Sequence, residues 1–355
     1  MALSNSVKEK ISIEVIKTLA TRFESFPKDT SGNRNAPFHD AFLEAFSDKF
    51  ANKVPDVQFF ISLSSWLQGL NTTLGQTFFE NIAHHLCNGE KREYTSKKLG
   101  NLQITKMQRD SISHIIANLS NSTAKPDLCS ENSKLFHISG SPLVNAFNFS
   151  VDVFFENQDS IVAIELKTVK PNSGEMRGEK QKILEGKAAL FNRFPDKKIY
   201  FYIGFPFDPT VGPTAEKTTS YNKERFLDSI INMDNFFDPR ETLLASELWD
   251  FLSGDKHTME QILEIINTIS NTSFEDELRL LMDNSKRDNP EYLAQLNKWN
   301  LFSELELLEH DELLQRNLTE RLRRIFNQSI FSPQGKYNWE RYNQLKLMIR
   351  QCSAR

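Results

Sequence analysis

Apolar residues recur at helical spacing in the first part of the chain, from Ser4 to about Phe60 and again from Leu63 to His85. A third stretch with the same spacing runs from Thr105 to Leu119. In an α-helix, residues three and four apart lie on one face, so this spacing produces a continuous apolar stripe. We therefore expect the N-terminal part of the chain to be helical.

The pattern changes to alternation in two segments, Phe149–Glu156 and Ile161–Lys167, which are joined by the short connection Asn157–Ser160. Alternating segments around a short polar connection are typical of a β-hairpin. An amphipathic stretch follows at Glu175–Phe194, and the aromatic run Ile199–Phe205 predicts a third strand at the centre of a sheet. The predicted order is strand, strand, helix, strand.

Downstream of about Leu243 nearly every segment has helical periodicity. The expected fold class is therefore α/β in the mixed, α+β sense, with a mixed central sheet flanked by helices. We expect an N-terminal helical region packed on the core at residues 1–125, a core at residues 126–242 and a C-terminal helical subdomain at residues 243–355.

Composition agrees with a globular protein, since 39% of the residues are hydrophobic and 25% are charged. No run of about eighteen apolar residues occurs, and the start carries Lys8 and Glu9, so we expect neither a membrane span nor a secretory signal and place the protein in the cytoplasm. The net charge of -4 gives no general attraction to nucleic acid. Any such partner requires a local basic surface.

Two charged side chains interrupt the second strand of the predicted hairpin. Side chains two apart on a strand share a face, so Glu165 and Lys167 project together while Ile164 and Leu166 point the other way. Asp152 interrupts the apolar first strand in the same manner. Because a buried charge is costly unless it is paired or metal-bound, these positions need an explanation.

The hairpin brings Asp152 and Glu165 to neighbouring positions on one face. Two carboxylates supply hard oxygen ligands suited to Mg²⁺. Hydrolysis of a phosphodiester requires charge neutralisation on the phosphoryl oxygens and an activated water, which carboxylate-held metal ions supply. A neighbouring ammonium such as that of Lys167 can orient the water and stabilise the developing charge. The three residues therefore form a candidate catalytic centre.

Short patterns of this kind are common, and other interpretations stay open. Asp152 can be an edge or turn residue, and Glu165 with Lys167 can be a surface ion pair. Two further functions use the same residues: a non-catalytic, sequence-specific DNA-binding protein on a nuclease scaffold, and a metal-dependent hydrolase of a smaller phosphate substrate. The surrounding hairpin, helix and third strand favour the nuclease.

The order Asp152, Glu165-Leu-Lys167, helix, strand resembles the PD-(D/E)XK nuclease superfamily. The longer string from Glu165 to Leu184 (Glu-Leu-Lys-Thr-Val-Lys-Pro-Asn-Ser-Gly-Glu-Met-Arg-Gly-Glu-Lys-Gln-Lys-Ile-Leu) resembles type II restriction endonucleases of the TdeIII family. The resemblance extends from roughly Ser65 to Pro209. Val151 departs from the motif, because the name of the superfamily places proline there.

The resemblance implies a restriction-endonuclease-like core and a type II site-specific deoxyribonuclease. Such an enzyme reads a short, roughly palindromic site as a homodimer and cleaves both strands of DNA with Mg²⁺, leaving 5′-phosphate ends. The target implied is GC-rich, of the GGNCC type. A cognate DNA methyltransferase is the implied functional partner.

Two further residues are candidates for the catalytic centre. Lys180 lies on the face of the predicted helix that turns toward the sheet, which makes it a candidate for an active-site or phosphate contact. Glu80 follows a helical opening segment and is a candidate third metal ligand, because a helical glutamate often approaches the metal carboxylates in folds that resemble this one. Ordinary helix packing or an ion pair explains either residue equally well.

A local surplus of basic residues surrounds the motif, including Lys170, Arg177 and Lys182. Phosphate contacts supply most of the affinity of proteins for DNA, so these three residues are candidates for DNA binding. A solvated helix face is the alternative interpretation.

Overall fold

The computed structural model describes residues 2–27, 41–43, 57–94, 102–137, 140–168, 173–212, 217–230, 233–317 and 319–353. These residues form two compact units. The core unit comprises Met1–Leu3 and Phe79–Ile262, and the helical unit comprises Ser4–Phe78 and Leu263–Arg355. This grouping differs from the three consecutive segments expected from the sequence, because the first helices pack with the last ones.

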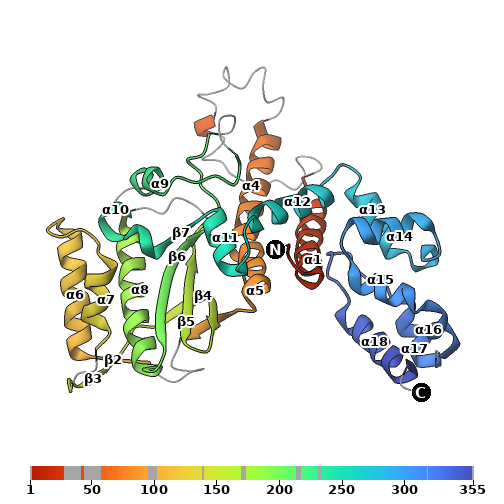
Figure 1. The fold of residues 1–355 in the computed structure, drawn as a ribbon. Coiled ribbons are helices and arrows are strands. Elements are labelled where there is room, and N and C mark those ends of the chain that lie inside the picture. The colour runs from red at the N-terminus through yellow and green to blue at the C-terminus, as the bar shows by residue number, and fades with distance from the viewer. Residues whose placement is uncertain are drawn as a thin grey trace. The chain divides into compact units, whose positions relative to one another are not determined.

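The core unit contains a mixed five-stranded sheet, which confirms the predicted fold class (Figure 1). The strand order is β1-β4-β5-β6-β7; β4 is antiparallel to β1 and β5, whereas β5, β6 and β7 are mutually parallel neighbours. The strands are β1 (Glu90–Tyr94), β4 (Phe149–Glu156), β5 (Ser160–Leu166), β6 (Lys198–Phe205) and β7 (Thr242–Leu244).

The strands β4 and β5 form the predicted hairpin. Their register pairs Glu156 with Ile161 and Val153 with Ile164. Every residue of β5 from Ile161 to Leu166 is buried, as expected for a strand with neighbours on both sides and both faces covered. A charged residue in this strand therefore lies in the interior of the sheet.

The helix α8 (Ser173–Arg193) connects β5 to the parallel strand β6 and packs against β6. Its packing face is made of small and aliphatic residues, among them the fully buried Ile183 and Ala189. At Gly186 a Cβ atom would lie 2.4 Å from the ring of Phe201, so only glycine permits this close approach of helix and strand. The helix is thereby held firmly over the sheet.

Shorter elements complete the core unit, and α6 and α7 pack against α8. They are α5 (Phe79–Cys87), β2 (Gln103–Thr105), α6 (Lys106–Ser120), α7 (Leu128–Leu135), β3 (Leu143–Asn145), α9 (Lys223–Ser229), α10 (Met233–Phe236), the 3-10 helix η2 (Pro239–Glu241) and α11 (Ser246–Ser253). The helix α12 (Thr258–Ile269) contains the point in the sequence where the core unit ends.

The helical unit joins residues from both ends of the sequence. In α1, the buried carboxylate of Glu9 accepts hydrogen bonds from the backbone N–H and hydroxyl of Ser303, at 2.6 and 2.8 Å. The ring of Phe23 stacks on Phe274, with 5.3 Å between the ring centroids. The described elements are α1 (Asn5–Glu24), α4 (Val57–Thr73), the π-helix η1 (Leu74–Phe78), α13 (Phe274–Met282), the 3-10 helix η3 (Asn284–Lys286), α14 (Pro290–Lys298), α15 (Phe302–Glu309), α16 (Asp311–Asn317), α17 (Glu320–Phe326) and α18 (Trp339–Ser353).

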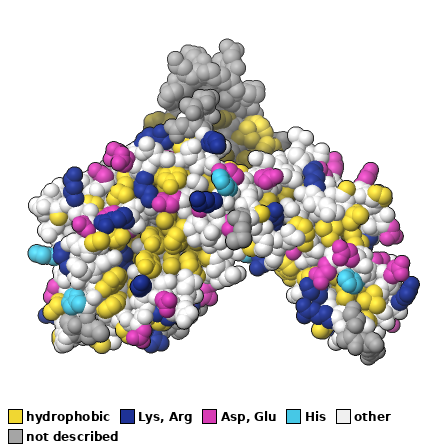
Figure 2. Space-filling view, in the orientation of Figure 1, with side chains coloured by type: hydrophobic (Ala, Val, Ile, Leu, Met, Phe, Trp, Pro, Cys, Tyr) yellow, Lys and Arg dark blue, Asp and Glu magenta, His cyan; other side chains and the backbone are white. Residues whose placement is uncertain are grey.

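None of the described helices is both long and apolar enough to cross a membrane. On the face shown in Figure 2, acidic and basic side chains are interspersed rather than gathered into one basic stripe. This distribution agrees with the small net charge, so any contact with a polyanion depends on a few local side chains.

Candidate active site

The structure brings Asp152 and Glu165 together across the β4–β5 hairpin. They are the residues next to the register pair Val153 and Ile164. The Asp152 carboxylate accepts a hydrogen bond from the backbone N–H of Leu166 at 2.9 Å, which fixes it beside the end of β5. The two carboxylate side chains are 14% and 7% exposed, so they are largely but not completely removed from water.

Lys167 lies on the same side of β5 as Glu165, with its Nζ 3.3 Å from Glu165 Oε1. Its backbone N–H donates to the carbonyl of Gly204 in β6, which continues the strand pairing past Leu166. Burial alone would lower the pKa of Lys167, but the hydrogen bond to Glu179 and the charge of Glu165 outweigh it and raise the pKa above its ordinary value. The side chain is therefore a stable ammonium.

The helix α8 supplies three more charged side chains to this site. Glu179 Oε1 lies 2.8 Å from the Nζ atom of Lys167, and Glu175 Oε1 lies 3.6 Å from it. Lys182 Nζ lies 2.6 Å from Glu165 Oε2. Lys182, which we expected to contact DNA, is thus ion-paired with the catalytic candidate Glu165. The sequence pattern did not indicate this contact.

Glu80 of α5 is linked to the site by Lys91, which pairs with both Glu80 and Asp152. Lys91 of β1 places its Nζ 3.1 Å from both carboxylate oxygens of Glu80 and 3.5 Å from Asp152 Oδ1. Burial raises the pKa of Glu80, and the negative charge of Asp152 raises it further. Among the residues that the structure describes, no group of three or more His, Cys, Asp or Glu side chains is arranged to hold a metal ion, so Glu80 does not complete a three-acid set with Asp152 and Glu165.

His84, also in α5, supports the strand that carries Asp152. Its Nε2 lies 2.7 Å from the backbone carbonyl oxygen of Asp152. Burial lowers the pKa of His84, which favours the neutral ring, and a neutral ring whose Nε2 carries the proton donates this hydrogen bond. The histidine therefore orients the backbone next to a candidate ligand.

These side chains together form what we call the active-site cluster. Its described acidic members outnumber its basic members by two. The acids are Glu80, Asp152, Glu165, Glu175 and Glu179, and the bases are Lys91, Lys167 and Lys182. Burial, followed by the charge of Asp152, raises the pKa of Glu165 to about 7.

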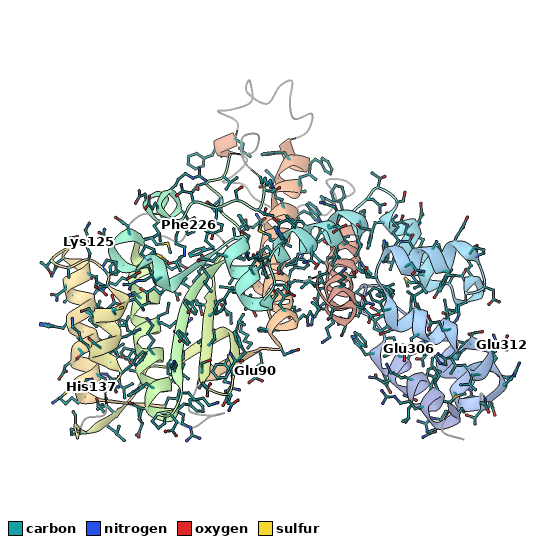
Figure 3. All side chains as sticks on the ribbon, in the orientation of Figure 1. Glu90, Lys125, His137, Phe226, Glu306 and Glu312 are labelled. Carbon is teal, nitrogen blue, oxygen red and sulfur yellow. The ribbon has the colours of Figure 1, made fainter. Side chains whose placement is uncertain are left out.

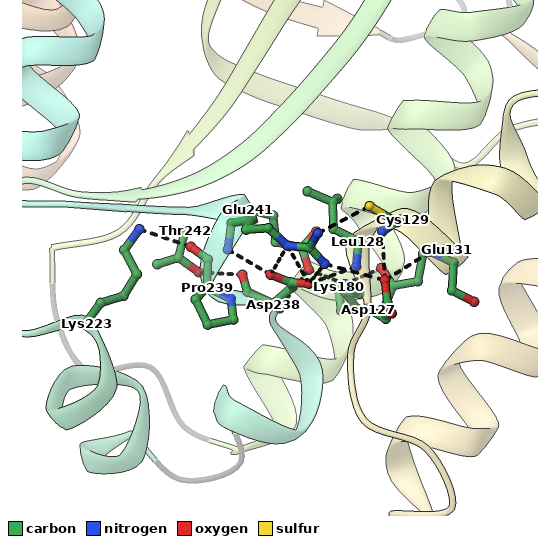
Figure 4. Close-up of polar contacts among 12 residues, drawn as sticks. Asp127, Leu128, Cys129, Glu131, Lys180, Lys223, Asp238, Pro239, Glu241 and Thr242 are labelled. Carbon is green, nitrogen blue, oxygen red and sulfur yellow. Dashed lines mark hydrogen bonds and ion pairs between the residues drawn. The ribbon is translucent and has the colours of Figure 1, made fainter.

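Lys180 does not join the active-site cluster, contrary to the expectation from its position on α8. Its side chain is fully buried and ion-paired with Glu241 of η2 and with Glu131 of α7, the latter at 2.7 Å (Figure 4). Lys187 lies 3.0 Å from the second oxygen of Glu241. These four residues, the buried cluster, lie apart from Asp152 and Glu165, and the fully buried Lys180 has no access to a phosphate.

No described contact joins the other two DNA-binding candidates, Arg177 and Lys170, to the active-site cluster. Arg177 is exposed on α8. Lys170 lies outside the described residues. Neither residue is brought to Asp152 and Glu165 by the described part of the chain.

The chemistry of the cluster suits a divalent cation. Asp152 and Glu165 offer carboxylate oxygens on neighbouring strands, which are the ligands that such an ion prefers. Glu165 Oε1 and Oε2 are ion-paired with Lys167 and Lys182, at 3.3 and 2.6 Å, so a metal ion bound at Glu165 would compete with these two lysines. A mixed sheet that presents Asp and Glu-Leu-Lys on adjacent strands, with helices on its faces, defines the class of restriction-endonuclease-like nucleases.

Comparison with known proteins identifies the family within that class. The profile of the type II restriction endonuclease HinfI matches residues 3–270. The chain is also 44% identical, over 363 aligned residues, to the type II restriction enzyme MjaII of Methanocaldococcus jannaschii, and the alignment covers 96% of each protein. The chain therefore belongs to the HinfI family of type II restriction endonucleases.

This finding confirms the predicted class of enzyme, a site-specific deoxyribonuclease whose substrate is DNA. Enzymes of this class generally use a divalent metal ion. The matching family is that of HinfI. The resemblance of the string from Glu165 to Leu184 to the TdeIII family stays a prediction.

Proposed function

We propose that the protein hydrolyses double-stranded DNA with Mg²⁺ at a short, roughly palindromic site and leaves 5′-phosphate ends. The observation that carries the proposal is the placement of Asp152 and Glu165 beside each other, with Lys167 Nζ 3.3 Å from Glu165. The carboxylate oxygens of these two acids are of the kind that Mg²⁺ prefers, which supports a divalent ion as the cofactor.

In this proposal Asp152 and Glu165 hold Mg²⁺. The bound ion supplies charge neutralisation on the phosphoryl oxygens and lowers the pKa of a water molecule. Lys167 orients that water and stabilises the charge that develops on the phosphate. The raised pKa of Lys167 favours its charged form, which is the form that this role requires.

The contribution of α8 is to hold the lysine in place. Glu179 lies 2.8 Å from Lys167 Nζ, which restricts the long side chain to the catalytic edge of the sheet. Preorganised charges of this kind need no rearrangement during the reaction. Lys170 and Arg177 are proposed to contact the DNA backbone, where they add affinity without reading bases.

A GGNCC-like target, a homodimer and a cognate methyltransferase complete the proposal. A roughly palindromic site is matched by a protein with two-fold symmetry, since each subunit then meets the same half-site. A cytoplasmic enzyme of this kind also meets the DNA of its own cell. It therefore needs a methyltransferase that modifies the same site.

Plasmid digestion tests the proposal. Purified protein with Mg²⁺ is expected to convert plasmids of varied sequence into defined fragments, and EDTA is expected to stop the reaction. Run-off sequencing of the ends gives the target and the cut position together. Asp152→Asn is expected to abolish cleavage, whereas Glu156→Gln, a matched change at the other end of β4, is expected to leave it intact. Varied plasmids that remain both uncut and unbound with Mg²⁺ would overturn the proposal.

A further inference from the structure

Lys91 stands between two carboxylates that belong to different elements. It follows Glu90, which Figure 3 labels at the start of β1. Its ammonium lies 3.1 Å from each carboxylate oxygen of Glu80 and 3.5 Å from Asp152 Oδ1. The lysine thus fills the space in which an acid of α5 and an acid of β4 face each other.

Lys91 lies at an irregular point of the β1–β4 ladder. Glu90 pairs with Phe154 and Arg92 pairs with Val151, so the register shifts at Lys91. Irregularities of this kind change the direction of side chains, and here the Lys91 ammonium lies against Glu80 and Asp152. The guanidinium carbon of the neighbouring Arg92 lies 3.7 Å from the ring centroid of Phe154 instead.

The contact differs from an ordinary surface ion pair. The lysine side chain is 46% exposed, but those of Glu80 and Asp152 are only 13% and 14% exposed. Exposed pairs contribute little to stability, since water screens both partners. Here two largely buried negative charges depend on one cation, and each destabilises the other when that cation is removed.

We propose that Lys91 limits the active site to a single divalent ion. Two carboxylates on either side of a gap are suitable ligands for a metal ion, and the ammonium of Lys91 occupies the gap between Glu80 and Asp152. One ion is then held between Asp152 and Glu165, while Glu80 is kept out of its coordination. The inference rests on the proposed metal dependence and adds the number of ions and the residue that sets it.

Calorimetric titration of the DNA-free protein with Mn²⁺ alone tests this role without measuring cleavage. The parent protein is expected to bind one ion per chain. Lys91→Met is expected to bind two, because Glu80 and Asp152 then face each other without a cation. Lys91→Arg keeps the charge and is expected to bind one. Lys197→Met, which removes a lysine paired with Glu156 at the other end of β4, is the matched control and is expected to bind one.

A double variant locates the additional ion. Adding Glu80→Gln to Lys91→Met is expected to return the stoichiometry to one ion, since one ligand of the new site is lost. Circular dichroism and urea unfolding establish that each variant is folded before it is titrated.

The possible failures are distinguishable. A folded parent that binds no Mn²⁺ contradicts the proposed metal site itself. A parent that binds two ions, or a folded Lys91→Met variant that binds one ion with unchanged affinity, leaves the metal site intact and overturns the role of Lys91 alone.

Discussion

The helix α8 carries two groups of charges with opposite properties. Lys180 and Lys187 lie seven residues apart on one face and join the buried cluster, in which two lysines meet two glutamates. Glu179 and Lys182 lie on another face, ~120° around the helix axis, and join the active-site cluster. The first cluster is charge-balanced and buried, whereas the second is partly open and has more acids than lysines among its described members.

The comparison shows how a structural charge cluster is separated from a functional one. A balanced cluster that has no contact with water and no surplus charge has nothing left to bind, so its role is to fix α7, α8 and η2 against one another. An unbalanced cluster near the surface costs stability in the absence of a ligand, and that cost indicates a site. Sequence position on the helix does not distinguish the two, because the glutamates that pair with Lys180 and Lys187 come from α7 and η2, far away in the sequence.

The largest expected effect is on catalysis in the active-site cluster. Lys167→Ala is expected to lower the cleavage rate by about 10³-fold, because it removes a charge aimed at the transition state. DNA affinity and the free energy of unfolding are expected to change little. Single-turnover cleavage and filter binding measure the two effects, with Lys197→Met as the control. Cleavage at the parent rate would remove Lys167 from the catalytic centre.

The next effect is on stability in the buried cluster. Glu241→Gln is expected to lower the free energy of unfolding by about 3–5 kcal/mol, because it leaves Lys180 and Lys187 buried with too little negative charge. The matched change Glu156→Gln, in a partly exposed pair with Lys197, is expected to cost less than about 1 kcal/mol. Urea denaturation compares them. Equal losses would show that burial does not separate the two kinds of ion pair.

Removing an acid from the active-site cluster is expected to raise the free energy of unfolding rather than lower it. In EDTA, Glu165→Gln is expected to stabilise the protein by about 1 kcal/mol at pH 8, as losses of strained active-site charges commonly do. The folded protein keeps the Glu165 proton up to about pH 7, whereas the unfolded chain loses it near 4.5, so the penalty grows as the pH rises through this range. The advantage of the variant is therefore expected to shrink toward pH 5. Urea unfolding at both pH values measures it, and a destabilised variant at pH 8 would contradict the surplus of acid.

The smallest expected effect concerns the solvent-exposed face of α8. Arg177→Ala is expected to weaken DNA binding only a few-fold and by a similar factor on every sequence, because a phosphate contact carries no base information. The slope of log affinity against log salt is expected to fall by about one unit. Binding titrations in several salt concentrations measure this slope. An unchanged slope would place Arg177 away from the DNA.

Much of the fold was predictable because its strongest signals are local. The alternation at Phe149–Glu156 and Ile161–Lys167 predicted the hairpin, and the amphipathic stretch from Glu175 predicted α8. The strand β1 was missed, since its sequence Glu-Lys-Arg-Glu-Tyr is almost entirely polar and gives no apolar alternation. An edge strand of this kind is defined by its partner β4 rather than by its own residues.

The site was predictable only as far as the hairpin extends. Asp152, Glu165 and Lys167 share one pair of strands, so the register brings them together without further information. Lys91 depends on β1, and Lys182 depends on the rotation of α8 about its axis, which periodicity fixes too coarsely to distinguish it from Lys180. Long-range packing therefore decides which lysine reaches the carboxylates.

The helical unit draws its residues from Ser4–Phe78 and Leu263–Arg355, with nearly all of the core unit between them in the sequence. During synthesis on the ribosome, Phe79–Ile262 emerges in full before the C-terminal partners of α1 exist, because Ser303 and Phe274 are translated later. Domains tend to fold as units while they are being made. The five-stranded sheet is thus able to form before α1 contacts its C-terminal partners.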